Sequence, residues 1–350
     1  MVSTQLRVGL LSVVLCLLHA ASARAQLLTS FLEPDDGRAP IVSALGQATQ
    51  SIDIYVFTLT LPSDDPIVAA LAAAVASGVA VRAVLEPCPG EGASCIPPDP
   101  EAVSGCELLT QAGAMVKWAN PAFIKTHAKS TLIDGARALV TTINLEPSSF
   151  TVRRDYGVLT DDSGVVQELA LVFNQDWQDD ALISDCTQPP SRAPDATVQG
   201  YGALVVTPDN ARDVLVGSPD APGLLRAPAS TLSIQMEKLD PQMSRGVIPA
   251  IRDTAARGVT VQVLLKEATG SLEQADAVIQ AGGQALCQRN LHAKLVIADG
   301  QQLFLGSQNL TRDSLDLRRE IGWITQDPAV LVRFGETFSS DWAAAEACTR

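Results

Sequence analysis

The sequence predicts an α/β protein built from two duplicated domains, each with a mixed or mostly parallel β-sheet flanked by helices. Strand-like and helix-like segments alternate along the chain, which is typical of α/β layers. A long block of residues recurs later in the chain with one constant offset, and a length of 350 residues is that of about two domains. Together these observations indicate one α/β unit present twice.

The N-terminal segment 1–25 has the layout of a secretory signal peptide. Arg7 precedes an apolar run over residues 8–18, and Ala23-Arg24-Ala25 forms a small-x-small cleavage site before Gln26. The apolar run is shorter than the roughly 20 residues that span a bilayer. We therefore expect cleavage after Ala25 and export to the periplasm or the medium.

Both domains are expected to begin with a strand, a helix and a second strand. In each copy the helix ends at a glycine, Gly78 or Gly258. The expected segments are 52–57, 66–77 and 79–85 in the first copy, and 232–236, 247–257 and 259–265 in the second. A proline-rich linker at 187–198 separates the first domain, 26–186, from the second, 199–350.

Further along each copy, an Asp-Gly pair between two apolar runs predicts a β-hairpin. In the first copy runs 127–133 and 138–142 flank Asp134-Gly135; in the second, Asp299-Gly300 precedes 303–305. Because residues two apart on a strand face the same side, His127 and Lys129 are expected to project together. Asp134 and Asp299 fall at the turns, where we expect a structural role.

The distribution of histidines singles out a candidate active site. The chain has three histidines, and His19 lies in the predicted signal peptide. The other two, His127 and His292, each begin the phrase His-x-Lys-x4-Asp, with Lys129 and Lys294 as the lysines. A lone histidine is most often a packed or solvent-facing residue, but two in the same phrase indicate chemistry.

The repeat continues downstream of both histidines. The matching pairs are Thr142 with Ser307, Asn144 with Asn309, Arg153-Arg154 with Arg318-Arg319, Asp155 with Glu320, Gly157 with Gly322, and Phe173-x-x-Asp176-Trp177 with Phe338-x-x-Asp341-Trp342. Lysines, hydroxyls and carboxamides are donors suited to phosphate oxygens. The copies differ where Gly306 of the second is Thr141 in the first. Since glycine lets a phosphate approach closely, Thr141 is expected to narrow the first half-site.

The two motifs, with Gly306-Ser307-Gln308-Asn309 after the second, resemble the phospholipase D superfamily over nearly the whole mature chain. The resemblance implies two phospholipase D-like domains packed with pseudo-twofold symmetry, which bring both histidines to one phosphate. It also implies a reaction without metal or cofactor. One histidine attacks phosphorus, and the other protonates the leaving alcohol and then activates water or a second alcohol.

The resemblance also implies roles for residues. By position, His127 is the nucleophile and His292 the acid/base. Phosphate is bound by Lys129, Lys294, Asn144 and Asn309, with the hydroxyls of Thr142 and Ser307. Asp155 and Glu320 match carboxylates that orient the histidines; the alternative is that they are exposed charges beside the arginine pairs. Trp118 and Phe123, just before the first motif, are candidates for the mouth of the site.

Charge and cysteines narrow the function further. Without Arg7 and Arg24 the mature chain has 23 basic and 39 acidic residues, a net charge of −16, which disfavours a non-specific nucleic-acid binder. The mature chain has six cysteines, enough for three disulfides of undetermined pairing. They lack Cys-x2-Cys spacing, so a metal site is the weaker interpretation. The six are Cys88, Cys95, Cys106, Cys186, Cys287 and Cys348.

The sequence thus predicts a monomeric, secreted phospholipase D-type phosphodiesterase (EC 3.1.4.-, most consistent with 3.1.4.4) that acts on phospholipids or other phosphodiesters at a membrane surface. The alternatives are a secreted endonuclease of the same superfamily and a non-catalytic binding protein on the same fold.

Overall fold

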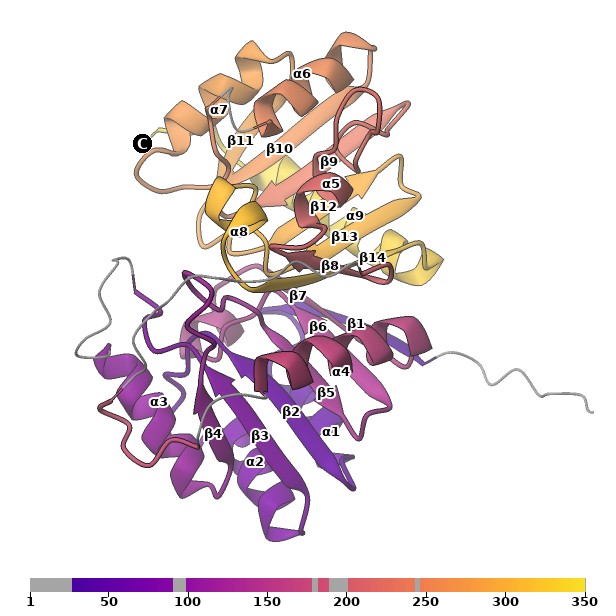
Figure 1. Ribbon diagram of the computed structural model, residues 1–350. Coiled ribbons are helices and arrows are strands. Elements are labelled where there is room, and N and C mark those ends of the chain that lie inside the picture. The colour runs from indigo at the N-terminus through magenta and orange to yellow at the C-terminus, as the bar shows by residue number, and fades with distance from the viewer. Residues whose placement is uncertain (1–26, 91–98, 178–181, 189–200, 243–245, 350) are drawn as a thin grey trace, which may run out of the picture.

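The computed structural model describes residues 27–90, 99–177, 182–188, 201–242 and 246–349. The predicted signal peptide, Cys95 and most of the predicted linker lie outside these ranges. The described chain forms two α/β units, one above the other in Figure 1, and each contains one seven-stranded sheet. None of the helices in the described ranges is long and apolar enough to cross a membrane.

The first sheet has the strand order β1-β7-β6-β5-β2-β3-β4. Its strands are β1 (Leu28–Glu33), β2 (Ser51–Val56), β3 (Ala80–Leu85), β4 (Met115–Trp118), β5 (Ser130–Ile133), β6 (Arg137–Thr141) and β7 (Asp155–Thr160). Strands β2, β3 and β4 are parallel, and the remaining neighbours pair antiparallel. The sheet is therefore mixed.

The second sheet repeats this order as β8-β14-β13-β12-β9-β10-β11. Its strands are β8 (Leu204–Thr207), β9 (Thr231–Met236), β10 (Thr260–Lys266), β11 (Gln284–Gln288), β12 (Lys294–Ala298), β13 (Gln302–Gly306) and β14 (Glu320–Thr325). Strands β9, β10 and β11 are parallel and the others antiparallel. The predicted duplicated α/β fold is confirmed.

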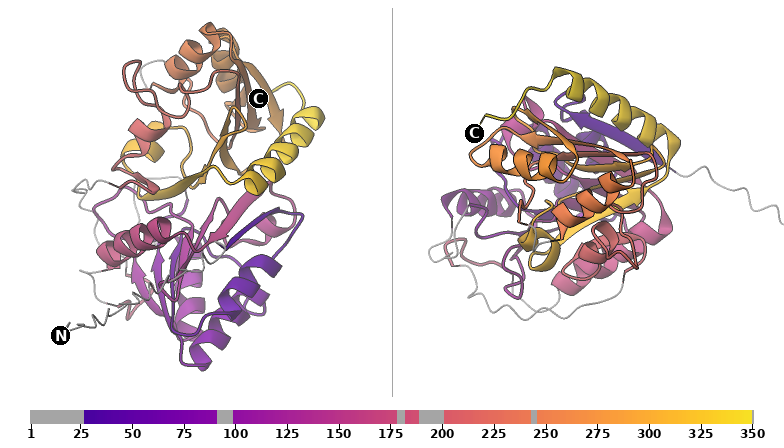
Figure 2. Two further views of the ribbon diagram at one scale, coloured as in Figure 1. Left: turned by 90° about the vertical axis from the view of Figure 1, so that its right-hand side faces the viewer. Right: turned by 90° about the horizontal axis from the view of Figure 1, so that it is seen from above.

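Helices cover both faces of each sheet. The first domain has α1 (Ala39–Gly46), α2 (Pro66–Ala76), α3 (Pro100–Gln111), the 3-10 helix η1 (Pro147–Phe150) and α4 (Ser163–Trp177). The second has α5 (Ala211–Leu215), α6 (Val247–Ala256), α7 (Ser271–Gln280), α8 (Arg312–Asp316) and α9 (Pro328–Ala344). Buried residues of α4 and α9 join one hydrophobic cluster with the inner faces of both sheets. Figure 2 shows α9 passing beside β1 of the other domain.

Local sequence signals explain where the helices begin and end. Asp65 caps α2 by accepting a hydrogen bond from the Ile67 amide at 3.0 Å, and proline occupies the first helical position. Gly78, with φ +85°, and Gly258, with φ +87°, follow α2 and α6 and turn the chain in the left-handed region. The predicted helices 66–77 and 247–257 therefore agree with the structure to within one residue.

The aspartates of the two motifs lie at hairpin turns. Asp134 accepts backbone hydrogen bonds from Thr49, Gln50 and Ser51 at 2.7–3.0 Å. Asp299 accepts the corresponding bonds from residues 229–231 at 2.8–2.9 Å. These amides lower the pKa of Asp299 and, against the opposing effect of burial, that of Asp134. Each carboxylate ties a hairpin turn to the start of the neighbouring strand.

The duplication also includes a segment that the sequence comparison missed. Residues 33–36, Glu-Pro-Asp-Asp, begin at the last residue of β1, and residues 207–210, Thr-Pro-Asp-Asn, begin at the last residue of β8. Asp36 and Asn210 each accept a hydrogen bond from a backbone amide four residues earlier, at 2.8 and 2.7 Å. The two segments share only two of their four residues, which is too little identity to reveal this part of the repeat from the sequence alone.

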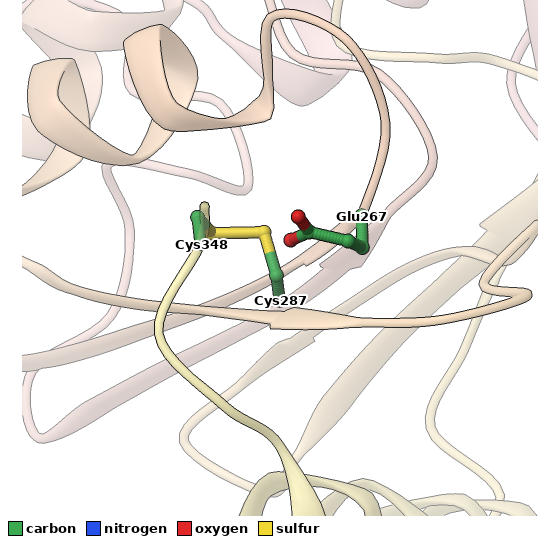
Figure 3. A group of neighbouring side chains, drawn as sticks. All are labelled: Glu267, Cys287 and Cys348. Atoms are coloured by element: carbon green, nitrogen blue, oxygen red, sulfur yellow. A yellow bond between two sulfur atoms is a disulfide. The ribbon is translucent and has the colours of Figure 1, made fainter. Parts of the chain in front are cut away.

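Two disulfides are described in full, Cys106–Cys186 and Cys287–Cys348, and Cys88 is also disulfide-bonded. The second tethers the C-terminal segment to β11, where Glu346 pairs with Cys287 through backbone hydrogen bonds. Glu267 lies beside this disulfide, as Figure 3 shows. These three side chains are close enough to share a metal ion, but the two sulfurs are bonded to each other and offer no thiolate.

Candidate active site

Both motif histidines lie at the interface of the domains. The backbone amide of His127 donates to the carbonyl of Arg319 at 2.8 Å, and that of His292 donates to the carbonyl of Arg154 at 3.2 Å. Each histidine is thus anchored by the opposite domain. Because the backbone of His127 bonds to the opposite domain, β5 begins only at Ser130. The predicted strand 127–133 is therefore too long by three residues.

Each imidazole is also held by a carboxylate of the opposite domain. Nδ1 of His127 lies 2.8 Å from Oε2 of Glu320, and Nδ1 of His292 lies 2.8 Å from Oδ1 of Asp155. Both carboxyl groups are buried. Because an ionised carboxylate only accepts hydrogen bonds, Nδ1 carries the proton in both pairs, and Nε2 is left for chemistry. Asp155 and Glu320 are therefore not the exposed charges of the alternative interpretation.

An arginine next to each carboxylate crosses the interface in the same way. Arg154 donates from Nε to Asp341 at 2.9 Å, and Arg319 donates from Nη2 to Asp176 at 3.1 Å. The Arg319 guanidinium also lies 4.1 Å from the centroid of the Phe123 ring. Phe123 and Trp118 are buried to the same extent as the two histidines, and their expected place at the mouth of the site stays a prediction.

The lysines lie beside their histidines, but their surroundings differ. Lys129 Nζ donates to the His127 carbonyl at 2.9 Å, and Lys294 Nζ to the His292 carbonyl at 2.6 Å. Burial, together with the charge of Lys294, lowers the pKa of Lys129 well below its usual value. The Lys129 ammonium lies 4.6 Å from the Phe57 ring centroid, whereas Lys294 forms an ion pair with Glu237 at 2.8 Å.

The predicted phosphate-binding hydroxyls are engaged elsewhere. Thr142 donates to Asp155 at 2.5 Å and accepts from the Tyr156 amide at 2.9 Å. Ser307 bonds to the backbone of Ile321, and both hydroxyl residues are fully buried. The two hydroxyls are therefore used in hydrogen bonds to β7 and β14, the strands that begin at Asp155 and Glu320.

The side chains of the two asparagines make hydrogen bonds to acids. Asn144 Nδ2 donates to Glu146 at 2.7 Å, and Asn309 Nδ2 donates to Glu237 at 3.4 Å. Sequence reasoning missed both acids, since neither belongs to a motif. Glu237 directly follows β9, as Phe57 follows β2, so the alignment anchored at Gly78 and Gly258 would have paired Glu237 with Phe57.

The glycine difference between the copies has a packing explanation. A Cβ on Gly306 would lie 2.4 Å from Cα of Gly322 on the paired strand. In the first copy the Thr141 hydroxyl donates to the carbonyl of Lys129 at 2.9 Å. The glycine is thus required by the neighbouring strand, and Thr141 points into the β5–β6 pair.

Burial dominates the electrostatics of the histidine pair. It lowers the pKa of His127 to about 3, against the opposing effect of the Glu320 carboxylate. It also lowers the pKa of His292, where Asp155 and Glu237 oppose it. The site therefore offers two buried imidazoles, each with one nitrogen fixed, together with two ammonium groups. This is a set of groups for nucleophilic and acid–base chemistry on an anion.

The chain belongs to the family of phospholipase D-like domains. The family model described as "Cardiolipin synthase, PLD-like domain" matches residues 41–177 and 224–342. The matched segments contain both histidine motifs, so the resemblance seen in the sequence is confirmed. Among curated proteins no sequence matches the chain.

Solved structures show the same fold at low identity. Phosphatidylserine synthase from Haemophilus influenzae Rd KW20 is similar with a TM-score of 0.62 and 13% identity, over 90% of this chain and 85% of that one. Polyphosphate kinase from Porphyromonas gingivalis is similar with a TM-score of 0.62 and 15% identity, over 89% of this chain. This chain spans 50% of the kinase's length.

Proposed function

We propose that the protein is a secreted phospholipase D-type phosphodiesterase that hydrolyses phospholipid head groups, or transfers the phosphatidyl group to an alcohol. The observation that carries this proposal is the crossed arrangement at the interface. Two buried histidines each have Nδ1 held by a carboxylate of the other domain, and each has a lysine beside it. Such a pair can act on the two sides of one phosphate.

In the first step His127 attacks and His292 protonates. Nε2 of His127 forms a bond to phosphorus while the bond from phosphorus to the leaving oxygen breaks. The leaving alkoxide takes a proton from Nε2 of His292, so the alcohol departs neutral. Lys129 and Lys294, with Asn144 and Asn309, neutralise and orient the phosphate oxygens.

The second step reverses these roles. His292, now neutral, takes a proton from water while the water oxygen attacks phosphorus and the phosphorus–nitrogen bond breaks. An alcohol in place of water gives transfer instead of hydrolysis. Glu320 and Asp155 keep both imidazoles oriented and stabilise the positive charge that each carries in turn. Thr142 supports this by its bond to Asp155 and takes no direct part in phosphate binding.

Charge favours a lipid over a nucleic acid as the substrate. A mature chain with a net charge of −16 repels polyanions at long range, and a non-specific nuclease depends on basic surface to hold phosphates. Disulfides persist in oxidising compartments, so the two described pairs support export. The nuclease remains the second candidate, because the same histidine pair would serve it equally well.

The mature protein should be assayed in EDTA with phosphatidylcholine and phosphatidylethanolamine vesicles and, in parallel, with single- and double-stranded DNA. Release of head groups without DNA cleavage is the expected result. DNA cleavage without head-group release would reject the lipid substrate, and loss of all activity in EDTA would reject the metal-independent mechanism. A His292→Asn preparation purified in the same way controls for contaminating enzymes.

A further inference from the structure

A carboxylate already lies among the anion-binding groups of the second half-site. Glu237 Oε2 is 2.8 Å from Lys294 Nζ, 3.4 Å from Asn309 Nδ2 and 3.7 Å from His292 Nε2. The other oxygen, Oε1, is 3.2 Å from the ammonium group of Lys266. Glu237 thus faces the nitrogen of His292 that its partner Asp155 leaves free.

The first half-site has an apolar ring in the corresponding place. Phe57 follows β2 as Glu237 follows β9, and its ring makes a T-shaped contact with the His127 ring, with centroids 4.3 Å apart. His127 therefore has one carboxylate, Glu320, on Nδ1 and an aromatic ring against its imidazole. His292 has a carboxylate on each side, at Nδ1 and near Nε2.

We propose that Glu237 is a positioning residue that assigns the acid role to His292 and leaves His127 as the nucleophile. An imidazole between two carboxylates is stabilised in its protonated form, which is the form that donates a proton to a leaving group. Phe57 brings no such charge to His127, and burial favours the neutral imidazole, which is the form that attacks phosphorus. This inference rests on the proposed function and adds a reason why the two histidines take different roles.

The surroundings of both residues support this assignment. The charged groups that act on His292 include Asp155, Glu237, Lys294 of its own motif and Glu146. Two of these acids have basic partners further out, Glu146 with Arg153 and Glu237 with Lys266. The charged groups that act on His127 include Glu320, Lys129 and Lys294. Two carboxylates, Asp155 and Glu237, thus flank His292, whereas Glu320 alone among these groups is a carboxylate acting on His127. Although burial opposes it, Lys294 and His292 hold the pKa of Glu237 well below its usual value, so its carboxylate is ionised.

The test is the pH dependence of Glu237→Gln, which keeps the shape of the side chain and removes its charge. The alkaline limb of kcat/KM against pH reports the acid in the free enzyme. We expect this limb to move to lower pH by about one unit or more, the shift typical of losing a nearby opposite charge. Glu237→Asp, which retains the charge, should keep the limb close to its original position.

Glu267→Gln is the matched control, because Glu267 follows β10 and bonds to Thr349 instead of a site residue. Its profile should coincide with that of the unmodified enzyme. If the alkaline limb of the Glu237→Gln profile also coincides with that of the unmodified enzyme, the proposal is wrong.

A second measurement is independent of turnover. The mature chain has two histidines, so nuclear magnetic resonance titration in a His127→Asn background reports His292 alone. Adding Glu237→Gln should lower the pKa of His292, and an unchanged pKa would overturn the inference even if the variant is inactive. The proposed function fails separately, if His127→Asn and His292→Asn retain activity.

Discussion

The two half-sites share their histidine, lysine and asparagine but differ in the residue that faces the imidazole. In the first half this residue is Phe57, 4.3 Å from the His127 ring; in the second it is Glu237, 3.7 Å from His292 Nε2. Both lie outside the repeated motifs. The comparison teaches that the duplication supplied the same side chains twice, and that residues outside the motifs give the two histidines different neighbours.

A second lesson concerns completeness. The orienting carboxylate of each histidine, and the backbone carbonyl that holds its amide, come from the other domain. Neither half-site is complete within its own domain. The two half-sites therefore depend on each other, and variants of the two halves can be compared pair by pair.

The largest effect is expected for the histidines themselves. We expect His127→Asn and His292→Asn each to lower kcat by at least about 10⁴-fold, because each removes a group that forms or breaks bonds to phosphorus. Steady-state hydrolysis of phospholipid vesicles measures this. Substantial activity in either variant would contradict the paired-histidine mechanism.

The crossed carboxylates come next. Asp155→Asn and Glu320→Gln should each lower kcat by about 10²- to 10⁴-fold, since the imidazole loses its orientation and the partner of its positive charge. Titration of the remaining histidine in a background that lacks the other would show which imidazole responds. The crossed pairing predicts that Asp155→Asn shifts His292 and leaves His127 nearly unchanged; the opposite pattern would rule out the pairing.

The two arginines that precede the orienting carboxylates differ in burial, so their substitution should affect the stability of the protein to different extents. Arg319 is buried with Asp176, whereas Arg154 is partly exposed and bonds to Asp341. Arg319→Met leaves a carboxylate buried without its charge partner and should cost about 3–5 kcal/mol of unfolding free energy. Arg154→Met should cost less, because water reaches its surroundings. Urea unfolding of both variants measures the difference, and an equal cost would show that burial does not separate them.

The last prediction concerns Glu33 and the pH dependence of stability. It lies beside Asp155 in the β1–β7 register, where the second half has Thr207, and burial raises its pKa from 4.5 to about 8. The Glu33 carboxyl group therefore ionises more readily in the unfolded chain than in the folded protein. As a result, the free energy of unfolding falls as pH rises from 4.5 to about 8. Glu33→Gln should remove this loss, at most about 1.4 kcal/mol per pH unit. Thermal unfolding from pH 4.5 to 8 measures it, and parallel curves for the two proteins would refute the expectation.

Much of the fold could be predicted from the sequence because its signals are local. The helix that ends at Gly78 and the hairpin at Asp134-Gly135 depend on turn chemistry and alternation within a few residues. The histidines, lysines and motif acids were recognisable because they recur. The bond from the Thr142 hydroxyl to Asp155 could not be predicted, because it depends on how the neighbouring strands pair.

The crossed pairings could not be predicted in the same way. They depend on how the domains dock, which brings Glu320 to His127 and Asp155 to His292. Glu237 gave no signal because it does not recur: its counterpart is Phe57. Residues that distinguish two copies are invisible to a comparison that searches for what the copies share.

The central claim is that one shared site uses its two histidines unequally, with His127 as the nucleophile. Rapid quenching of the mature protein with phospholipid, followed by mass spectrometry of its peptides under alkaline conditions, measures this directly. The account predicts acid-labile phosphate on the peptide that contains His127. Phosphate on the peptide that contains His292 instead would contradict it.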